Sequence, residues 1–192
     1  MLLIGICGPS TSGKTTLCKS LVKEYNSEHI EVDNYLKAKK DLPEEHGFKN
    51  WELPENIRFD VLMKNLEDLK EGKSTKIPIY ECGVDEITKF REVSPKEFIF
   101  VEGYYIFHNK EVRDLFDIKI YLDISEEEIL KRKAKLGEEG CEWVDKIYLE
   151  KIFLPAHRKY AVPQKKYADF VIDGTLSKKE IKEKVKISLK SF

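Results

Sequence analysis

The sequence lacks the features that mark a membrane-embedded, secreted or zinc-stabilised protein. No apolar run in its 192 residues approaches the roughly 20 needed to cross a bilayer. The N-terminus has neither a basic segment nor a small-residue cleavage site. The four cysteines, Cys7, Cys18, Cys82 and Cys141, form no Cys-x-x-Cys pair, and no histidine stands at zinc-finger spacing. These absences predict a cytoplasmic, reduced protein without a structural metal.

The sequence also has little net charge. Its 34 lysines and arginines nearly balance 35 aspartates and glutamates, which gives a formal net charge of −1. This balance does not indicate that the protein surface as a whole binds nucleic acid or a membrane. With 41% hydrophobic and 36% charged residues, the chain can bury a core and cover it with charge. We expect residues 1–192 to form one domain with small-molecule partners.

Apolar runs alternate with amphipathic stretches along the chain, a pattern typical of a parallel sheet covered by helices. Strands are predicted at 2–7, 29–32, 98–103, 118–123 and 168–173. Helices are predicted from 15, over 57–71, after Ser125, over 144–160 and over 177–189. Residues 137–140 are expected to break the third helix, and Pro155 to kink or end the fourth. The sequence therefore predicts an α/β fold with a five-stranded parallel sheet and helices on both faces.

Residues 8–15 read Gly-Pro-Ser-Thr-Ser-Gly-Lys-Thr, which matches the Gly-x4-Gly-Lys-Thr phosphate loop of P-loop NTPases. The motif follows an apolar strand and opens a helix, which is the context it requires. Glycines free the backbone so that successive N–H groups and the helix N-terminus can surround an anion. Lys14 is expected to reach the β- and γ-phosphates and Thr15 to hold Mg²⁺. The predicted nucleotide-binding residues are Gly8, Pro9, Ser10, Thr11, Ser12, Gly13, Lys14, Thr15 and Thr16.

The motif alone does not choose among ATPases, GTPases and kinases, or between ATP and GTP. The guanine motif Asn-Lys-x-Asp is absent, since Asn109-Lys110-Glu111-Val112 lacks the final aspartate. A transporter signature, Leu-Ser-Gly-Gly-Gln, is absent as well. These absences favour a small-molecule kinase that uses ATP and Mg²⁺.

Two carboxylates follow predicted strands, at the sheet edge where α/β proteins bind their ligands. Asp33 is placed to accept a proton from a substrate hydroxyl; its structural alternative is a cap on a helix or turn. Glu102 is placed to hold Mg²⁺ directly or through water; its alternative is a structural hydrogen bond. Arg132, in the basic run 131–135, is predicted to stabilise charge on the transferred phosphoryl group, although a solvated basic face would explain the run equally well.

The order of motifs resembles the uridine kinase family, within the wider group of phosphoribulokinase and nicotinamide riboside kinase. The resemblance covers nearly the whole chain and rests on the phosphate loop and on residues 33–35, 50–54, 78–81, 102–116, 132 and 155–169. It implies that Asp33 is the catalytic base, that Glu52 holds ribose hydroxyls and that Tyr80 lines the nucleoside site. Tyr35 and Trp51 are further candidates for the substrate site, with packing at the edge of the core as their alternative. The resemblance implies ATP-dependent phosphorylation of a nucleoside, most simply uridine or cytidine at the ribose 5′-hydroxyl.

The chain also departs from that family. Cys82 and Asp85 stand where the family has an aromatic residue and a histidine that recognise the pyrimidine, and the arginine-rich lid is replaced after Arg132. Two alternatives therefore stay open: a kinase for nicotinamide riboside or another sugar or vitamin-like alcohol, and an ATP-binding sensor without transfer activity. We expect a lid over about 129–150, a β-hairpin over about 76–94 covering the acceptor site, and, from the resemblance, a homo-oligomer.

Overall fold

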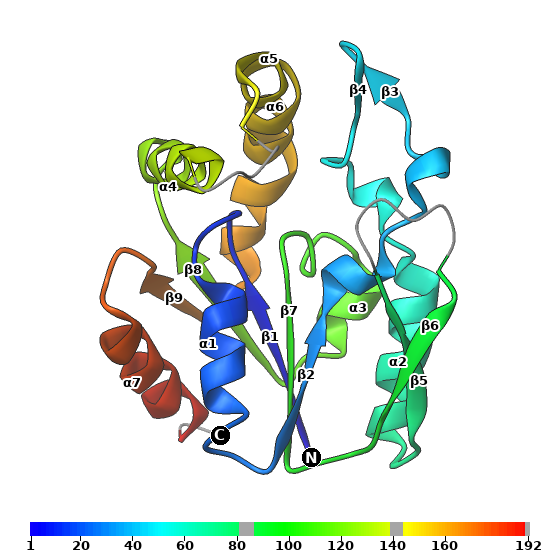
Figure 1. Ribbon diagram of the computed structural model, residues 1–192. Coiled ribbons are helices and arrows are strands. Elements are labelled where there is room, and N and C mark those ends of the chain that lie inside the picture. The colour runs from blue at the N-terminus through cyan, green and yellow to red at the C-terminus, as the bar shows by residue number, and fades with distance from the viewer. Residues whose placement is uncertain (81–86, 139–143, 191–192) are drawn as a thin grey trace.

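The fold is built on a parallel sheet of five strands, seen in a computed structural model that describes residues 1–80, 87–138 and 144–190 (Figure 1). The strand order is β2-β7-β1-β8-β9, and every neighbouring pair is parallel. The strands are β1 (Leu2–Cys7), β2 (Ser27–Glu31), β7 (Phe98–Gly103), β8 (Ile118–Asp123) and β9 (Phe170–Asp173). The predicted five-stranded α/β fold is confirmed. β1 lies at its centre, which places the loop that follows β1 in the middle of the carboxyl edge.

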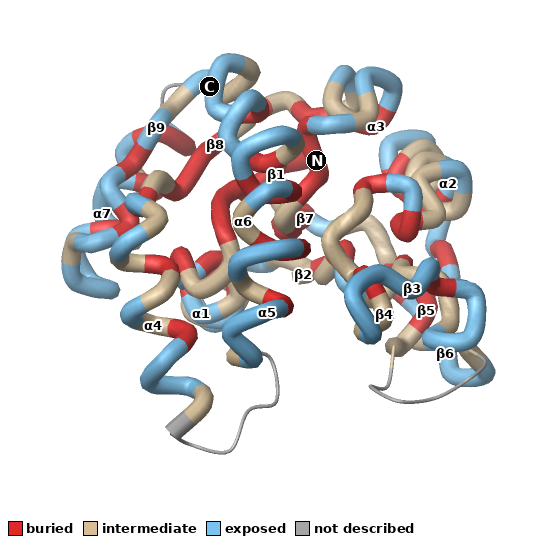
Figure 2. Tube along the Cα trace, turned by 90° about the horizontal axis from the view of Figure 1, so that it is seen from above, coloured by how far each residue is buried: buried red, intermediate tan, exposed pale blue. Residues whose placement is uncertain are grey.

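Helices cover both faces of this sheet, because side chains of a strand alternate between the faces. From β1, Ile4 and Ile6 pack with α1 (Lys14–Leu21) and α7 (Lys178–Leu189). Leu3 and Cys7 point the other way and pack with α2 (Phe59–Lys70) and α3 (Lys110–Asp114). The buried residues form a band through the middle of the molecule with exposed segments around it (Figure 2). The near-continuous apolar strands reflect this two-sided burial.

The described elements between residues 32 and 93 lie on the β2 side of the sheet (Figure 1). They begin with the 3₁₀ turn η1 (Val32–Tyr35) and continue through η2 (Lys39–Asp41), the short pair β3 (Glu44–Glu45) and β4 (Phe48–Lys49), and η3 (Pro54–Asn56). After α2, β5 (Thr75–Ile79) pairs antiparallel with β6 (Lys89–Val93), which are the strands of the expected hairpin. Between them, residues 81–86, which include Cys82 and Asp85, lie outside the described residues.

The lid region begins with α4 (Glu126–Glu138), which starts at a Ser125 cap, as predicted. The helix ends at Glu138, inside the predicted break over 137–140, and the rest of that break lies outside the described residues. A side chain at Gly137 would meet Val144 at 2.5 Å, so this position requires a glycine. Pro155 does not end the helical run, but the run is irregular on both sides of it: α5 (Lys146–Tyr148), the π-type turn η4 (Leu149–Phe153), α6 (Leu154–Ala156), the π-type turn η5 (His157–Ala161) and the 3₁₀ turn η6 (Val162–Tyr167). Among the described helices, none combines the length and apolar character of a membrane-crossing helix.

Candidate active site

The phosphate loop runs from the end of β1 to the first residue of α1. Gly8 lies against the next strand: a Cβ added there would sit 2.5 Å from the backbone oxygen of Leu122, so no side chain fits. Gly13 has φ +96°, a left-handed conformation that glycine adopts without strain. It directly precedes Lys14 at the start of α1, so the helix N-terminus faces the loop. The local sequence thus accounts for an anion-binding loop of the expected form.

Two side chains at the start of α1 point into this site. Lys14 is only 8% exposed, and its Nζ donates a hydrogen bond to the Pro9 backbone oxygen at 2.8 Å. The Thr15 hydroxyl donates to Glu102 Oε1 at 2.6 Å. Because this hydroxyl donates to a carboxylate, its lone pairs stay available to a cation. Lys14 and Thr15 therefore lie where phosphate and metal binding were predicted, although ligand binding itself stays a prediction.

Glu102 is a buried carboxylate that the surroundings keep ionised. Burial alone would raise its pKa, but the neighbouring His29 imidazole, the charge of Lys14 and the Thr15 hydrogen bond outweigh burial and hold the pKa below its usual value. The His29 Nε2 lies 3.6 Å from Glu102 Oε1. A carboxylate and a hydroxyl at 2.6 Å are hard oxygen donors, which suit Mg²⁺. No group of three or more metal-ligating side chains occurs in the described residues, so Mg²⁺ here would also need phosphate oxygens and water.

Asp33 lies across the cavity from the phosphate loop, in η1 directly after β2. It opens into the cavity, yet surrounding protein displaces much of its hydration. This desolvation, together with repulsion from Glu102, raises the pKa of Asp33 to about 6. At neutral pH the group is still ionised but more basic than an ordinary aspartate. It has the properties needed to accept a proton from a hydroxyl.

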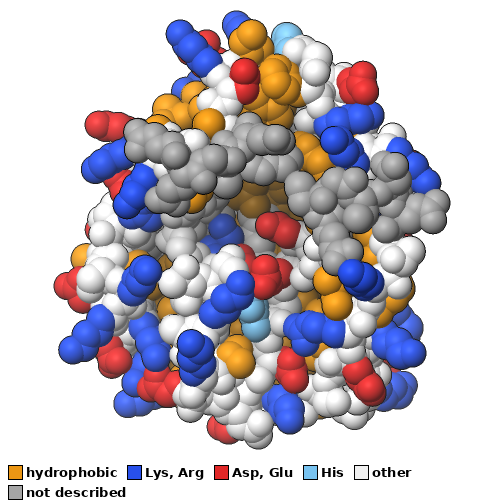
Figure 3. Space-filling model, in the orientation of Figure 1, with side chains coloured by type: hydrophobic (Ala, Val, Ile, Leu, Met, Phe, Trp, Pro, Cys, Tyr) orange, Lys and Arg blue, Asp and Glu red, His pale blue; other side chains and the backbone are white. Residues whose placement is uncertain are grey.

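One cavity of about 570 Å³ joins the phosphate loop to the predicted acceptor residues. Thr11, Lys14 and Thr15 line its donor end, and the residues of the other walls come from distant segments: Asp33, Trp51, Glu52, Tyr80, Glu102, Tyr104, Tyr105 and Lys133. Trp51 and Tyr80 meet edge to face with ring centroids 6.1 Å apart. Acidic side chains gather in the hollow at the centre of this face, with basic side chains around it (Figure 3). The structure thus brings together the predicted base, metal-binding acid and acceptor residues.

Glu52 is held in the acceptor part of this cavity by contacts from two sides. The Tyr148 hydroxyl donates to its Oε1 at 2.9 Å, and the Tyr105 hydroxyl donates to its backbone oxygen at 3.0 Å. Desolvation raises the pKa of Glu52, while the positive charge of Lys133 and the Tyr148 hydrogen bond act in the opposite direction. A fixed carboxylate of this kind can accept hydrogen bonds from the hydroxyl groups of a bound alcohol.

Tyr35 is not part of this cavity, which corrects its prediction as a substrate-binding residue. Its side chain is fully buried in the core, and its hydroxyl donates to Asn65 Oδ1 at 2.9 Å. Tyr35 belongs to the same 3₁₀ turn as Asp33, but two residues along such a turn their side chains point in different directions. Burial of the ring then supports the turn that carries Asp33.

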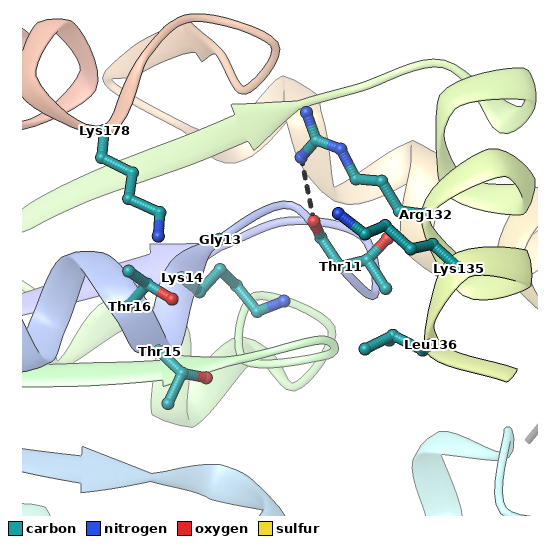
Figure 4. Close-up of a pocket in the computed structure, with 9 residues that line it drawn as sticks. All are labelled: Thr11, Gly13, Lys14, Thr15, Thr16, Arg132, Lys135, Leu136 and Lys178. Carbon is teal, nitrogen blue, oxygen red and sulfur yellow. Dashed lines mark hydrogen bonds between the residues drawn. The ribbon is translucent and has the colours of Figure 1, made fainter. Parts of the chain in front are cut away.

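Arg132 bridges the phosphate loop and the loop after β9. Its Nη1 donates to the Thr11 backbone oxygen at 3.0 Å (Figure 4). Its Nη2 donates to the Gly174 backbone oxygen, also at 3.0 Å. Its Nε donates to Glu128 Oε1 at 2.7 Å. These contacts place Arg132 beside the donor end of the site and fix the loop backbone. Its predicted contact with the transferred phosphoryl group stays a prediction.

Sequence analysis missed four residues at or beside the cavity. Lys133 follows Arg132 on α4, and because neighbouring helix residues point about 100° apart, it faces the acceptor cavity and the Phe153 ring instead of the phosphate loop. Tyr104 and Tyr105 follow Glu102-Gly103, so the strand-end argument that selected Glu102 could have selected them as well. Tyr148 carries no comparable signal, because its contact with Glu52 spans 96 positions of sequence.

Comparisons with known proteins agree with this arrangement. A sequence model of the Phosphoribulokinase / Uridine kinase family matches residues 3–181. The uridine kinase of Chlamydia pneumoniae is 35% identical over 184 residues, which cover 91% of this chain and 82% of that protein. The uridine kinase of Brevibacillus brevis is 34% identical over 179 residues, which cover 89% of this chain and 84% of that protein. The match therefore includes the loop, the sheet and the acceptor segments.

A solved structure gives the same fold. The structure of a possible uridine kinase from Bacillus stearothermophilus superposes with a TM-score of 0.59 and 24% identity, covering 90% of this chain and 88% of that one. At this identity the likeness concerns the fold alone.

Proposed function

Since the chain belongs to the phosphoribulokinase/uridine kinase family, we propose that it transfers the γ-phosphate of ATP to the ribose 5′-hydroxyl of a nucleoside, with uridine or cytidine as the acceptor. Support comes from the family match and from the names of relatives that share about a third of its residues. The donor would lie on residues 8–16, and the acceptor between Asp33, Trp51, Glu52 and Tyr80.

One observation carries this proposal: a single cavity connects the phosphate loop to Asp33 and Glu52. A nucleotide-binding sensor needs only the donor end. A kinase needs a base and a second binding region within reach of the γ-phosphate, and Asp33 and Glu52, which line the same cavity as the loop, would supply them. The aromatic pair Trp51 and Tyr80 provides flat apolar surface of the kind that contacts a base or sugar.

The proposed mechanism assigns each residue one step. The loop N–H groups and Lys14 bind and orient the phosphates. Glu52 orients the acceptor by accepting hydrogen bonds from the acceptor's hydroxyl groups. Asp33 accepts the 5′-hydroxyl proton as that oxygen forms a bond to the γ-phosphorus, while the bond from the γ-phosphorus to the bridging oxygen of ADP breaks. Lys14 and Arg132 stabilise the charge that develops on the phosphoryl group. Thr15 and Glu102 would hold Mg²⁺, which supplies charge neutralisation to the phosphates.

The decisive experiment measures ADP release with MgATP over a panel of acceptors: uridine, cytidine, nicotinamide riboside, other nucleosides and small sugars. We expect turnover with a pyrimidine nucleoside and formation of its 5′-monophosphate. Turnover confined to nicotinamide riboside or a sugar would show that the protein is a kinase but that its acceptor is not a pyrimidine nucleoside. MgATP binding without acceptor-dependent turnover on a broad panel would contradict transfer and favour a sensor.

A further inference from the structure

A second, cationic cavity of about 520 Å³ lies at the phosphate loop and adjoins the first, because Thr11, Lys14 and Thr15 line both. Its lining contains four basic side chains and no acidic one: Lys14, Arg132, Lys135 and Lys178. Two of the four already have fixed partners, because Lys14 donates to Pro9 and Arg132 donates to Thr11, Gly174 and Glu128. The two remaining cations, Lys135 and Lys178, line this cavity and do not line the acceptor cavity.

Lys178 is the first residue of α7. Its position is well defined, because Ser177 and Glu180 form a reciprocal cap that fixes where this helix begins. Its side chain extends from α7 toward Thr16 and the start of α1 (Figure 4). It is exposed and forms no ion pair within the described part of the chain. A lysine directed at the anion-binding end of another helix is suited to bind an anion held there.

Lys135 approaches the loop from the opposite side. It lies on α4, one turn after Lys131, and its side chain points toward Thr11 (Figure 4). Like Lys178 it is exposed and has no ion pair among the described residues. Lys131, by contrast, does not line the cavity and pairs with Glu128 at 3.8 Å. Position on the helix, not basic composition alone, therefore separates Lys135 from its neighbour.

We propose that Lys135 and Lys178 bind the phosphate chain of the donor nucleotide from two sides. Phosphates on a loop of this kind run from the helix start toward the tip of the loop lysine, with the α-phosphate first. Lys178, beside Thr16, is placed for the α- and β-phosphates, and Lys135, beside Thr11, for the γ-phosphate. The two lysines supply positive charge at the donor from α4 and α7, where the chain lacks the arginine-rich lid segment. This inference rests on the proposed function, because it takes ATP as the donor.

The test compares dissociation constants of MgATP and MgADP for the full-length chain by titration calorimetry. Lys178→Ala should weaken both nucleotides about tenfold, as expected for loss of a charged hydrogen bond. Lys135→Ala should weaken MgATP about tenfold and MgADP less than twofold, because only ATP carries the γ-phosphate. Lys178→Arg and Lys135→Arg should restore most of the affinity.

Two matched controls separate direct contact from a general loss of positive charge. Lys131→Ala removes a lysine from α4, and Lys184→Ala removes an exposed lysine from α7; neither residue lines the cavity. Both should bind MgATP as the unaltered chain does. Equal weakening in a control and its paired variant, or unchanged affinity in both Lys135→Ala and Lys178→Ala, would overturn the proposal. Failure of the unaltered chain to bind MgATP would instead overturn the proposed function together with it.

Discussion

The donor and acceptor halves of the site are built in different ways. The core of the donor half is one continuous stretch, residues 8–16, whose shape follows from two glycines and a helix start. The acceptor half collects Asp33, Glu52, Tyr80 and Lys133 from four separate segments. Each of these depends on packing elsewhere, as when Tyr148 and Tyr105 fix Glu52.

This contrast explains why a short sequence motif predicts the donor half, whereas no short motif predicts the acceptor half. Backbone groups of a local loop recognise phosphate, which is the same in every nucleotide. The proposed acceptor site is made of side chains from distant segments, and any of them can change without disturbing the loop. Damage to the acceptor half should therefore leave donor binding intact.

Asp33→Ala should give the largest effect. We expect turnover to fall by about 10²–10⁴, the usual contribution of a general base, while the dissociation constant of MgATP changes little. Steady-state kinetics with the preferred nucleoside, together with ATP calorimetry, would measure both. Full turnover in this variant would remove Asp33 from the mechanism, and a large loss of ATP binding would break the proposed separation of the halves.

Glu52→Gln should act on the acceptor alone. The amide retains the shape and can still accept from Tyr148, but it loses the charge, so the KM for the nucleoside should rise about 10- to 100-fold. The KM for ATP should stay constant. Glu55→Gln, at an exposed site in η3, is the matched control. An equal rise for both substrates would show that Glu52 supports the whole site rather than the acceptor.

The pH dependence should report the raised pKa of Asp33. Its pKa of about 6 means that the carboxylate is ionised and able to accept a proton above pH 6. Below that value it becomes protonated, so kcat/KM for the nucleoside should fall by about tenfold per pH unit. MgATP binding measured over the same range serves as the comparison. A kcat/KM that stays level down to pH 5 would contradict this assignment.

Tyr35→Phe should have the smallest effect on catalysis. Loss of its hydroxyl leaves buried Asn65 Oδ1 without this donor, so the free energy of unfolding should drop by about 1–3 kcal/mol. The kinetic constants should remain within twofold of the unaltered chain. Trp51→Ala should act in the opposite way: because Trp51 lines the cavity, its loss should raise the KM for the nucleoside. Denaturant unfolding and acceptor kinetics on both variants test this, and a changed nucleoside KM in Tyr35→Phe would return that residue to the substrate site.

Much of the fold and the donor loop could be predicted because their signals are local. Apolar runs gave the five strands, and strand ends placed Asp33 and Glu102 at one edge, as the structure has them. Tyr35 follows the alternative named for it, packing in the core, because an aromatic residue beside Asp33 in sequence carries no signal that tells which side of the turn its ring takes. Lys133 was missed because nothing in a run of basic residues says which face of the helix meets the cavity. At Pro155 the helical run continues between two π-type turns, because such turns tolerate the missing backbone N–H of proline without ending the run.

The central position of β1 affects how the chain folds during its synthesis. β1 leaves the ribosome well before the two strands that pair with it, because β7 and β8 begin only at Phe98 and Ile118. Until then its apolar residues and both of its edges stay unsatisfied, which slows folding and exposes the young chain to aggregation. A fragment that stops before Phe98 would hold the complete phosphate loop sequence and still be unable to fold it.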